Sequence, residues 1–516
     1  MKIVLKTFKS ILLQTIGIFI LLCFACGLLH ILSSYFLVNI ADKQLNKQFL
    51  KIINSGFVKS YDVKRKHHIL STDETVVLVL NPQAINVAVD KLIPNHQLIN
   101  NSSTSDITVS YHNQISYGLF SGALHGNFIP MIAFVNTDIN FSPELNNLLD
   151  KVFAENTPIT IHNMIFLDKS GEYNIFSPKF SYEEAVSGIK FLSQGVNLIV
   201  KYNSVLNSFD YKLNIPYLFL NIPNMLLFEL KKLIYSSKVN HVDHIITNTD
   251  SILNLTEFKL QLQQIDDNTR SKIQAIAGYF AGLSYLKMIE NIAFDSFSNF
   301  EIDNLLYKLQ VIGKDNLISS KMLVNANKVI VSNNQYTDLK FDIDINHILA
   351  DSFYKLFDIN AETNNLQAQN LILSIANNNP SVSIHEISLN SHNGKLMING
   401  DISIEHNNII SVDSIFDALH ADINVQVPKD FLSYLFILHM KYFLMSQNTE
   451  LDKNSEKTFN KIMLLLFNTQ IKLWTKKSFI INNNGLLSTK ILLDDGVLYF
   501  NKHPIKSIDT IDPPKL

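Results

Sequence analysis

Residues 339–345 read L-K-F-D-I-D-I, an alternation of apolar and charged side chains. Successive side chains of a β-strand point to opposite faces, so this period of two predicts a strand with one buried and one solvated face. The same alternation is present in D-I-T-V-S-Y-H at 106–112 and in A-D-I-N-V-Q-V at 421–427. Half-buried strands are typical of antiparallel sheets, whereas strands of parallel sheets are apolar throughout. The pattern therefore predicts a large, mainly antiparallel β domain.

Three short segments predict tight turns within this domain. They read D-K-S-G at 168–171, H-N-G at 392–394 and D-D-G at 494–496. Each contains residues that tolerate the positive φ angles of hairpin turns. We therefore expect a β-hairpin at each position.

Helices are expected after several strands, because the alternating pattern gives way there to apolar residues at helical spacing. The junctions carry either proline, which the first turn of a helix tolerates, or asparagine, which caps a helix. The expected helices cover 83–92 after Pro82, 224–235 after Pro223, 347–357 after Asn346 and 429–442 after Pro428. A further helix is predicted within 268–297, where apolar residues recur every three or four positions.

The chain begins with a strong membrane signal. An uncharged, mainly apolar run extends from Ser10 to Ala41, and Lys2, Lys6 and Lys9 precede it. A bilayer core takes about 20 helical residues to cross, so the run is long enough for a span. Lysines before the span favour a cytoplasmic N-terminus. This orientation places the rest of the chain on the far side of the membrane. In a bacterium the chain would then be a single-pass protein of the inner membrane with its main domain in the periplasm.

Two alternatives for this run remain open. One is a cleaved signal peptide, although the apolar stretch is longer than the 7–15 residues, roughly, of a secretory core. The other is lipidation at Cys26, which follows Ala25 in a sequence resembling a lipoprotein cleavage site. Cys23 and Cys26 are the two cysteines of the chain and both lie in the run, so the rest folds without disulfides.

The composition disfavours nucleic acid as a partner. Of the 43 basic residues only Arg65 and Arg270 are arginines, and the net charge is -3. Proteins that bind nucleic acids usually have a basic surface on which arginine is prominent.

The predicted fold class is α+β, with one N-terminal transmembrane helix followed by a large, mainly antiparallel β domain and amphipathic helices packed on or capping the sheets. The expected parts of the chain are a cytoplasmic N-terminus (1–9), a transmembrane anchor (10–41), a linker helix (42–70), an N-terminal periplasmic β-rich lobe (71–264), a helical segment (265–327) and a C-terminal periplasmic β-rich lobe (328–516).

Short motifs along nearly the whole chain suggest a family. After the anchor come Tyr61 and the sequence L-S-T-D at 70–73, then H-G-N-F-I-P at 125–130, N-N-Q-Y-T-D-L at 333–339 and a terminal hairpin with D-G-V-L-Y-F-N at 495–501. In this order and spacing the chain resembles the YdgA-like proteins of gram-negative bacteria. The resemblance implies an inner-membrane anchor and a periplasmic domain, and it implies no reaction.

The sequence assigns no catalytic, cofactor-binding or metal-binding residues. It contains no glycine-rich phosphate loop and no serine in a hydrolase motif. His125 precedes Gly126, and a turn at the end of a strand explains it better than catalysis. His241, Asp243 and His244 form the best metal-like cluster, but a fourth ligand at informative spacing is missing.

Apolar segments point to binding rather than catalysis. Residues 431–445 and 462–467 are rich in large apolar side chains, which either fill a large core or line a groove for lipid. In the second case Met225, Leu226 or Phe467 should line the groove. We expect a non-enzymatic envelope protein that binds a lipid or a protein partner in envelope assembly or maintenance. An envelope hydrolase with an unreadable active site and an oligomeric periplasmic scaffold are the alternatives.

Overall fold

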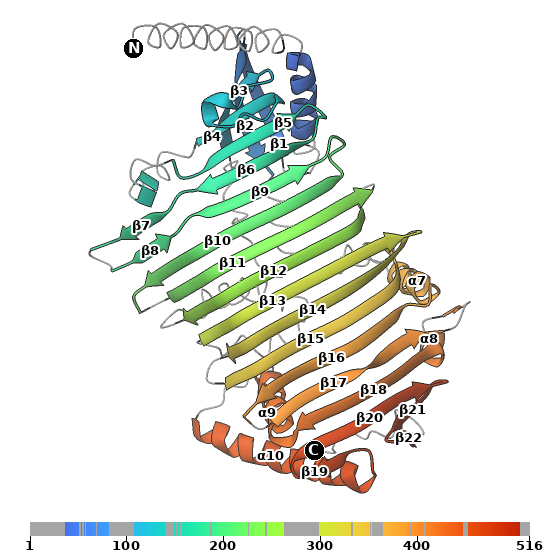
Figure 1. Cartoon of the computed structure of the whole chain (residues 1–516). Coiled ribbons are helices and arrows are strands. Elements are labelled where there is room, and N and C mark those ends of the chain that lie inside the picture. Colours follow the sequence, from blue (N-terminus) through green and yellow to red (C-terminus); the bar gives the residue numbers. More distant parts are fainter. Residues whose placement is uncertain are drawn as a thin grey trace, which may run out of the picture. The chain divides into compact units, whose positions relative to one another are not determined.

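The computed structural model (Figure 1) describes most of residues 33–505. The longer segments outside the described residues are 1–32, 82–107, 141–148, 263–298, 353–364, 447–452 and 506–516, and shorter gaps of one to three residues occur elsewhere. The chain divides into two compact units. Unit 1 comprises Met1–Tyr182 and Ser193–Leu213, and unit 2 comprises Glu183–Leu192 and Asn214–Leu516.

Unit 1 contains an antiparallel sheet and a helix at residues 37–50. The pairing order is β1-β2-β3-β4-β5-β6-β9, with every neighbouring pair antiparallel. The strands are β1 (Val58–His67), β2 (Ser71–Leu80), β3 (Thr108–Tyr117), β4 (Met131–Asn140), β5 (Thr160–Phe166), β6 (Gly171–Ser177) and β9 (Val196–Tyr202), and the short 3-10 helix η1 (Ala123–His125) lies between β3 and β4. The strands β7 (Phe180–Glu183), β8 (Lys190–Ser193) and β10 (Ser208–Ile222) contain or adjoin the boundaries between the units.

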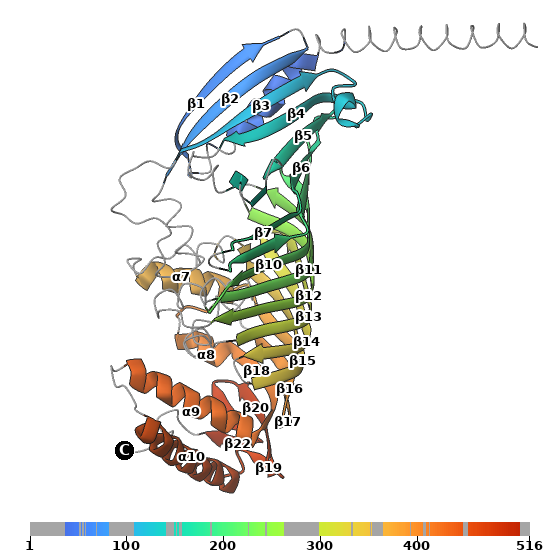
Figure 2. The same ribbon diagram turned by 90° about the vertical axis from the view of Figure 1, so that its left-hand side faces the viewer.

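Unit 2 is built on longer strands. They pair antiparallel in the order β11-β12-β13-β14-β15-β16-β17-β18-β20. The strands are β11 (Leu226–Val242), β12 (Ile245–Leu262), β13 (Asn299–Lys314), β14 (Leu317–Val331), β15 (Asn334–Leu349), β16 (Ser381–Ser391), β17 (Gly394–Ile404), β18 (Leu419–Pro428), β19 (Ile481–Asn483), β20 (Leu486–Asp494), β21 (Val497–Phe500) and β22 (His503–Ile505). The helices are α7 (Asn365–Ala376), α8 (Asp413–Ala418), α9 (Lys429–Ser446) and α10 (Lys453–Lys476), and Figure 2 shows them on one side of this sheet.

The structure supports the coarse fold prediction, a large antiparallel β domain with few helices. The stretches 339–345 and 421–427 lie in β15 and β18. The predicted hairpins are confirmed, since β5 pairs with β6, β16 with β17 and β20 with β21 around the predicted turns. The helix predicted after Pro428 is α9.

Three helical predictions are wrong in whole or in part. The segment 42–70, expected as a linker helix, is helical at 42–50, but Val58–His67 form the strand β1, which pairs with β2 along its length. The helix expected at 224–235 is most of β11, which pairs with β12. The helical segment expected at 265–327 contains β13 and most of β14 from Asn299 onward. In each case pairing with a neighbouring strand overrides a local pattern that allows a helix.

The membrane span expected at 10–41 lies almost wholly outside the described residues. Among the helices that the structure describes, none combines the length and apolar character that a membrane crossing needs. Cys23, Cys26 and the helix predicted at 83–92 also lie outside the described residues, and that predicted within 268–297 does too.

Candidate functional site

The helix at 37–50 packs onto the sheet of unit 1 through an apolar stripe. Ala41 is fully buried against a cluster that includes Ile115 and Ile132. The helix residues packed around this cluster are Leu37, Val38, Ile40 and Leu45. Spacings of three and four residues place such side chains on one face of a helix. The end of the predicted anchor is thus part of the core of unit 1.

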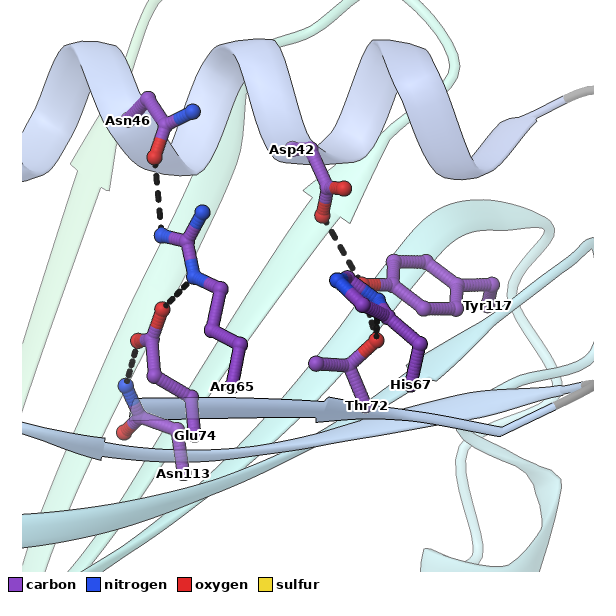
Figure 3. Close-up of polar contacts among 8 residues, drawn as sticks. All are labelled: Asp42, Asn46, Arg65, His67, Thr72, Glu74, Asn113 and Tyr117. Carbon is purple, nitrogen blue, oxygen red and sulfur yellow. Dashed lines mark hydrogen bonds and ion pairs between the residues drawn. The ribbon is translucent and has the colours of Figure 1, made fainter. Parts of the chain in front are cut away.

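Polar side chains of β2 lie on the side of the sheet that the helix covers, because buried and partly exposed residues alternate along this strand. Thr72, Glu74, Val76 and Leu78 are its buried residues. The first two are polar, and Figure 3 shows that each is linked to the helix through a third side chain: Thr72 through Tyr117, and Glu74 through Arg65. A buried polar group must find a hydrogen-bond partner, so these contacts fix the position of the helix. We call this row of polar contacts between the helix and the sheet the seam.

Tyr117 joins the helix to the sheet at one end of this seam (Figure 3). Its hydroxyl donates a hydrogen bond to Asp42 Oδ1 at 2.9 Å and lies 3.0 Å from Thr72 Oγ1. Thr72 Oγ1 also lies 2.9 Å from His67 Nδ1. Burial raises the pKa of Tyr117 well above its usual value of 10, and the Asp42 carboxylate raises it further. The phenol therefore keeps its proton and remains a donor.

Arg65 forms the second cluster of the seam. It stands opposite Glu74 in the β1–β2 register and forms an ion pair with it. Asn113 Nδ2 donates to Glu74 Oε1 at 2.8 Å, and Arg65 Nη2 donates to Asn46 Oδ1 at 2.8 Å. Glu74 is 7% exposed, and Arg65 and Asn113 supply the partners that a buried carboxylate needs. Arg65 stands out in the sequence as one of two arginines, but its partner Glu74 follows only from the register of β1 against β2.

A third group of polar contacts surrounds Gln48. Gln48 Oε1 accepts hydrogen bonds from Asn163 Nδ2 at 3.0 Å and from the Tyr173 hydroxyl at 2.7 Å. Asn163 Oδ1 in turn accepts from the Tyr202 hydroxyl at 2.8 Å. Burial raises the pKa of both tyrosines. These hydrogen bonds hold the helix, while Gln48 Nε2 is buried without a hydrogen-bond partner among the described residues. The groups do not form a nucleophile with a base.

His125 lies in the connection between β3 and β4, as the last residue of η1. Its ring stacks on Phe134 with centroids 4.4 Å apart, and its centroid lies 5.8 Å from that of His162. Burial lowers the pKa of His162, and the neighbouring His125 lowers it further. The turn expected at this position is present, and the pair is a packed aromatic cluster rather than an acid–base pair.

In unit 2 one face of the sheet carries a ladder of ion pairs. Lys231 Nζ lies 2.8 Å from Glu257 and 3.2 Å from Glu229. Lys259 also pairs with Glu257, and Lys328 lies 2.7 Å from Asp303. Opposite charges on neighbouring strands are a common way to stabilise a solvated sheet face.

Further along this sheet Asp342, Asp344 and His385 place their ligand atoms within 4.8 Å of one another. Asp344 already pairs with Lys321 at 3.1 Å and with His385 at 3.3 Å, and Lys340 lies 3.5 Å from Asp342. Lysines thus neutralise the carboxylates, so the group belongs to the ion-pair ladder. Of the metal-like cluster expected in the sequence, His241 lies in β11, while Asp243 and His244 are outside the described residues.

The opposite face of the unit 2 sheet is apolar on β11–β15, and we call it the apolar face. Leu260, Phe300, Ile302 and Ala326 are buried there, and the partly buried residues around them are Leu226, Phe228, Phe258, Leu305, Val329, Val331 and Leu339. The register confirms a common face, since Phe228 stands opposite Leu260 and Leu260 opposite Phe300.

The apolar face continues to the part of the sheet that α9 and α10 cover. Val329 stands opposite Tyr336 in the β14–β15 register. Tyr336 packs against a core that contains Phe431 of α9 and Phe467 of α10. Phe467 is 6% exposed, so the expectation that it lines a groove is wrong. Leu226 is partly buried at the apolar face, and Met225 lies outside the described residues.

Comparison with known proteins finds one family. A protein-family model described as "Bacterial protein of unknown function (DUF945)" matches residues 15–507. Neither curated proteins nor solved structures gave a significant match.

Proposed function

Since the chain belongs to the DUF945 family of bacterial proteins of unknown function, we propose its function from its own surfaces: it binds the acyl chains of a lipid on the apolar face of unit 2. In this proposal the protein is a non-enzymatic, YdgA-like component of the cell envelope. The run at 10–41 anchors it in the inner membrane with the N-terminus in the cytoplasm. The two units lie in the periplasm and act in envelope assembly or maintenance.

The difference between the two faces of the unit 2 sheet carries this proposal. Phe258 and Lys259 are neighbours in β12, and Phe258 belongs to the apolar face while Lys259 belongs to the ion-pair ladder on the opposite face. The ladder has its charges paired and suits contact with water. On the apolar face, leucine, phenylalanine and valine side chains that are only partly buried surround the four buried residues. Apolar surface that is left partly open favours a hydrophobic ligand.

The chemistry of the apolar face fits acyl chains better than a peptide. An extended peptide needs backbone hydrogen bonds from its partner, whereas an acyl chain is held by burial and dispersion contacts alone. The side chains of the apolar face have no hydrogen-bonding groups.

Site-specific photocrosslinking in bacterial cells tests the proposal with the full chain. A benzophenone amino acid replaces Phe258 on the apolar face in one variant and Lys259 on the opposite face in the matched control. After irradiation the protein is purified and digested, and the mass of the peptide that carries the label is measured. We expect a lipid adduct at position 258 and none at 259.

Other adducts would decide between the alternatives. A crosslink from position 258 to another protein would indicate that the apolar face binds a protein partner and not a lipid. A crosslink to a second copy of the chain would favour an oligomeric scaffold. No adduct at 258, or equal lipid adducts at both positions, would overturn acyl-chain binding. Separately, protease added to intact cells and to spheroplasts tests the location, because a periplasmic chain is cut only in spheroplasts.

A further inference from the structure

The loops at one end of the unit 1 sheet lie in a single row, and the strand register defines that row. Tyr117 at the end of β3 stands opposite Ala133 near the start of β4. Met131 pairs with Phe166 at the end of β5, and Gly171 at the start of β6 pairs with Tyr202 at the end of β9. The connections at 118–130, 167–170 and 203–207 therefore all leave the sheet at the same end. We call them the loop end of unit 1.

Large apolar side chains project from each of these connections. Phe128 is 73% exposed and Ile129 is 56% exposed in the connection between β3 and β4. Leu167 is 52% exposed in the β5–β6 hairpin, and Val205 is 58% exposed after β9. Single exposed apolar residues are ordinary on protein surfaces, but an apolar residue at each of three neighbouring loop tips marks an interaction surface.

The apolar run of the sequence reaches the same end. The backbone N–H of Leu119 donates a hydrogen bond of 3.0 Å to Ser33 Oγ. Ser33 belongs to the uncharged run from Ser10 to Ala41, and Leu119 lies in the connection that also contains Phe128. The point at which the run meets unit 1 is thus part of the loop end.

We propose that the loop end of unit 1 rests on the lipid bilayer, with Phe128, Ile129, Leu167 and Val205 inserted at the level of the headgroups. This inference rests on the proposed anchoring, which brings the bilayer to Ser33. Transfer of an apolar side chain of this size from water to the membrane interface is favourable, and several such side chains together orient a tethered domain.

The charged groups of the loop end agree with this position. Asp168 follows Leu167, and its carboxylate accepts hydrogen bonds from the backbone N–H and the hydroxyl of Ser170, at 3.0 and 2.6 Å. The carboxylate is therefore folded back onto its own turn. Lys169 is exposed beside it, and its long side chain can keep the ammonium among the headgroups.

Tryptophan fluorescence in vesicles tests the proposal. The chain has one tryptophan, Trp474 in α10, so Trp474→Phe gives a silent background. Phe128→Trp in this background is reconstituted as the full chain into phosphatidylcholine–phosphatidylglycerol vesicles, with or without bromine on the acyl chains near the headgroup. Inserted tryptophan contacts the bromines, so we expect them to quench the emission about twofold.

Phe176→Trp is the matched control. Phe176 is 46% exposed and lies near the far end of β6, opposite Thr160, so its replacement should remain unquenched. Ile129→Trp and Val205→Trp repeat the measurement in case Phe128→Trp disturbs the fold.

Extraction with alkaline carbonate separates the possible failures. If the chain resists extraction but tryptophan at 128, 129 and 205 is not quenched, the result supports the membrane anchor and overturns the loop-end proposal. A blue-shifted emission without quenching indicates contact with protein, which also overturns it. Quenching in a chain that carbonate removes supports bilayer contact but contradicts the anchor. A chain that does not bind the vesicles at all contradicts both.

Discussion

The Tyr117 hydroxyl donates a hydrogen bond of 2.9 Å to the Asp42 carboxylate, across 75 positions of the sequence. Tyr117 ends β3, and Asp42 directly follows the apolar run that ends at Ala41. This contact and the apolar stripe of the helix at 37–50 mean that the run does not lead into a loose linker. If the run spans the membrane, the sheet of unit 1 is attached to it with little freedom.

Replacing Tyr117 by phenylalanine tests this attachment. The ring keeps its packing, but Asp42 loses a donor and the buried Thr72 hydroxyl loses a partner. We expect the free energy of unfolding of unit 1 to fall by about 1–2 kcal/mol. Hydrogen exchange of the amides at 37–50, measured on the full chain in detergent, should become faster.

Tyr61→Phe is the control for this change. Tyr61 is 50% exposed and contacts Phe49 through its ring, so removal of its hydroxyl should change stability by less than about 0.5 kcal/mol. Equal effects of the two substitutions would show that the Tyr117 hydroxyl does not fasten the helix.

Phe467 and Leu465 distinguish core from surface on α10. Phe467 is 6% exposed in the core shared with α9, whereas Leu465 is 68% exposed. Phe467→Ala should destabilise unit 2 by about 3–5 kcal/mol because it leaves a cavity. Leu465→Ala should cost less than about 0.5 kcal/mol. Thermal unfolding of the full chain measures both, and a mild effect at Phe467 would restore its expected place in a ligand groove.

The sequence predicts much of the sheet, because apolar and polar residues alternate along its strands and glycine occurs in its turns. The pattern at 339–345 reflects a strand with one buried face, and the turn at 392–394 reflects the need for a positive φ angle. Both requirements are local, so a single sequence is enough to predict them. The helix α9 is also readable, because Pro428 ends a strand and apolar residues follow in a long block.

Other parts depend on contacts that are distant in the sequence. The segment 226–242 contains apolar residues at spacings that suit a helix or a strand, and pairing with β12 decides between the two. β1 is largely exposed on both faces, so its sequence shows little alternation. The ion pair of Arg65 with Glu74 follows from the register of β1 against β2, which the sequence alone does not give.

Gly171 should tolerate no larger residue. A Cβ atom there would lie 2.1 Å from the Tyr202 hydroxyl oxygen and 2.3 Å from the Met164 carbonyl oxygen. The carbonyl belongs to the backbone of β5 and cannot turn away, so Gly171→Ala should cost about 3 kcal/mol or more. Gly126→Ala is the comparison, because Gly126 has open space but a φ of 77°, and its strain is about 1–2 kcal/mol. Urea unfolding should rank Gly171→Ala as the more destabilising, and the reverse order would contradict the close contact.

Glu386 should make the stability of unit 2 depend on acid pH. Lys340 at 3.0 Å, then Ser388 at 2.8 Å and Lys395 at 3.2 Å, lower the pKa of Glu386 from 4.5 to about 2. A folded-state pKa below the unfolded value adds stability above about pH 4.5, and this contribution is lost as the pH falls toward 2.

Because these groups are partly exposed, solvent screens them and the contribution is at most about 1 kcal/mol. The measurement compares the wild-type protein with Glu386→Gln by thermal unfolding between pH 6 and pH 3. The wild type should be the more stable at pH 6, and the gap should narrow as the pH falls, since the wild-type carboxylate is then protonated in the unfolded chain. Glu405→Gln, on the exposed segment after β17, should show no such change. A gap that stays constant over this range would mean that the lysines do not hold the Glu386 charge.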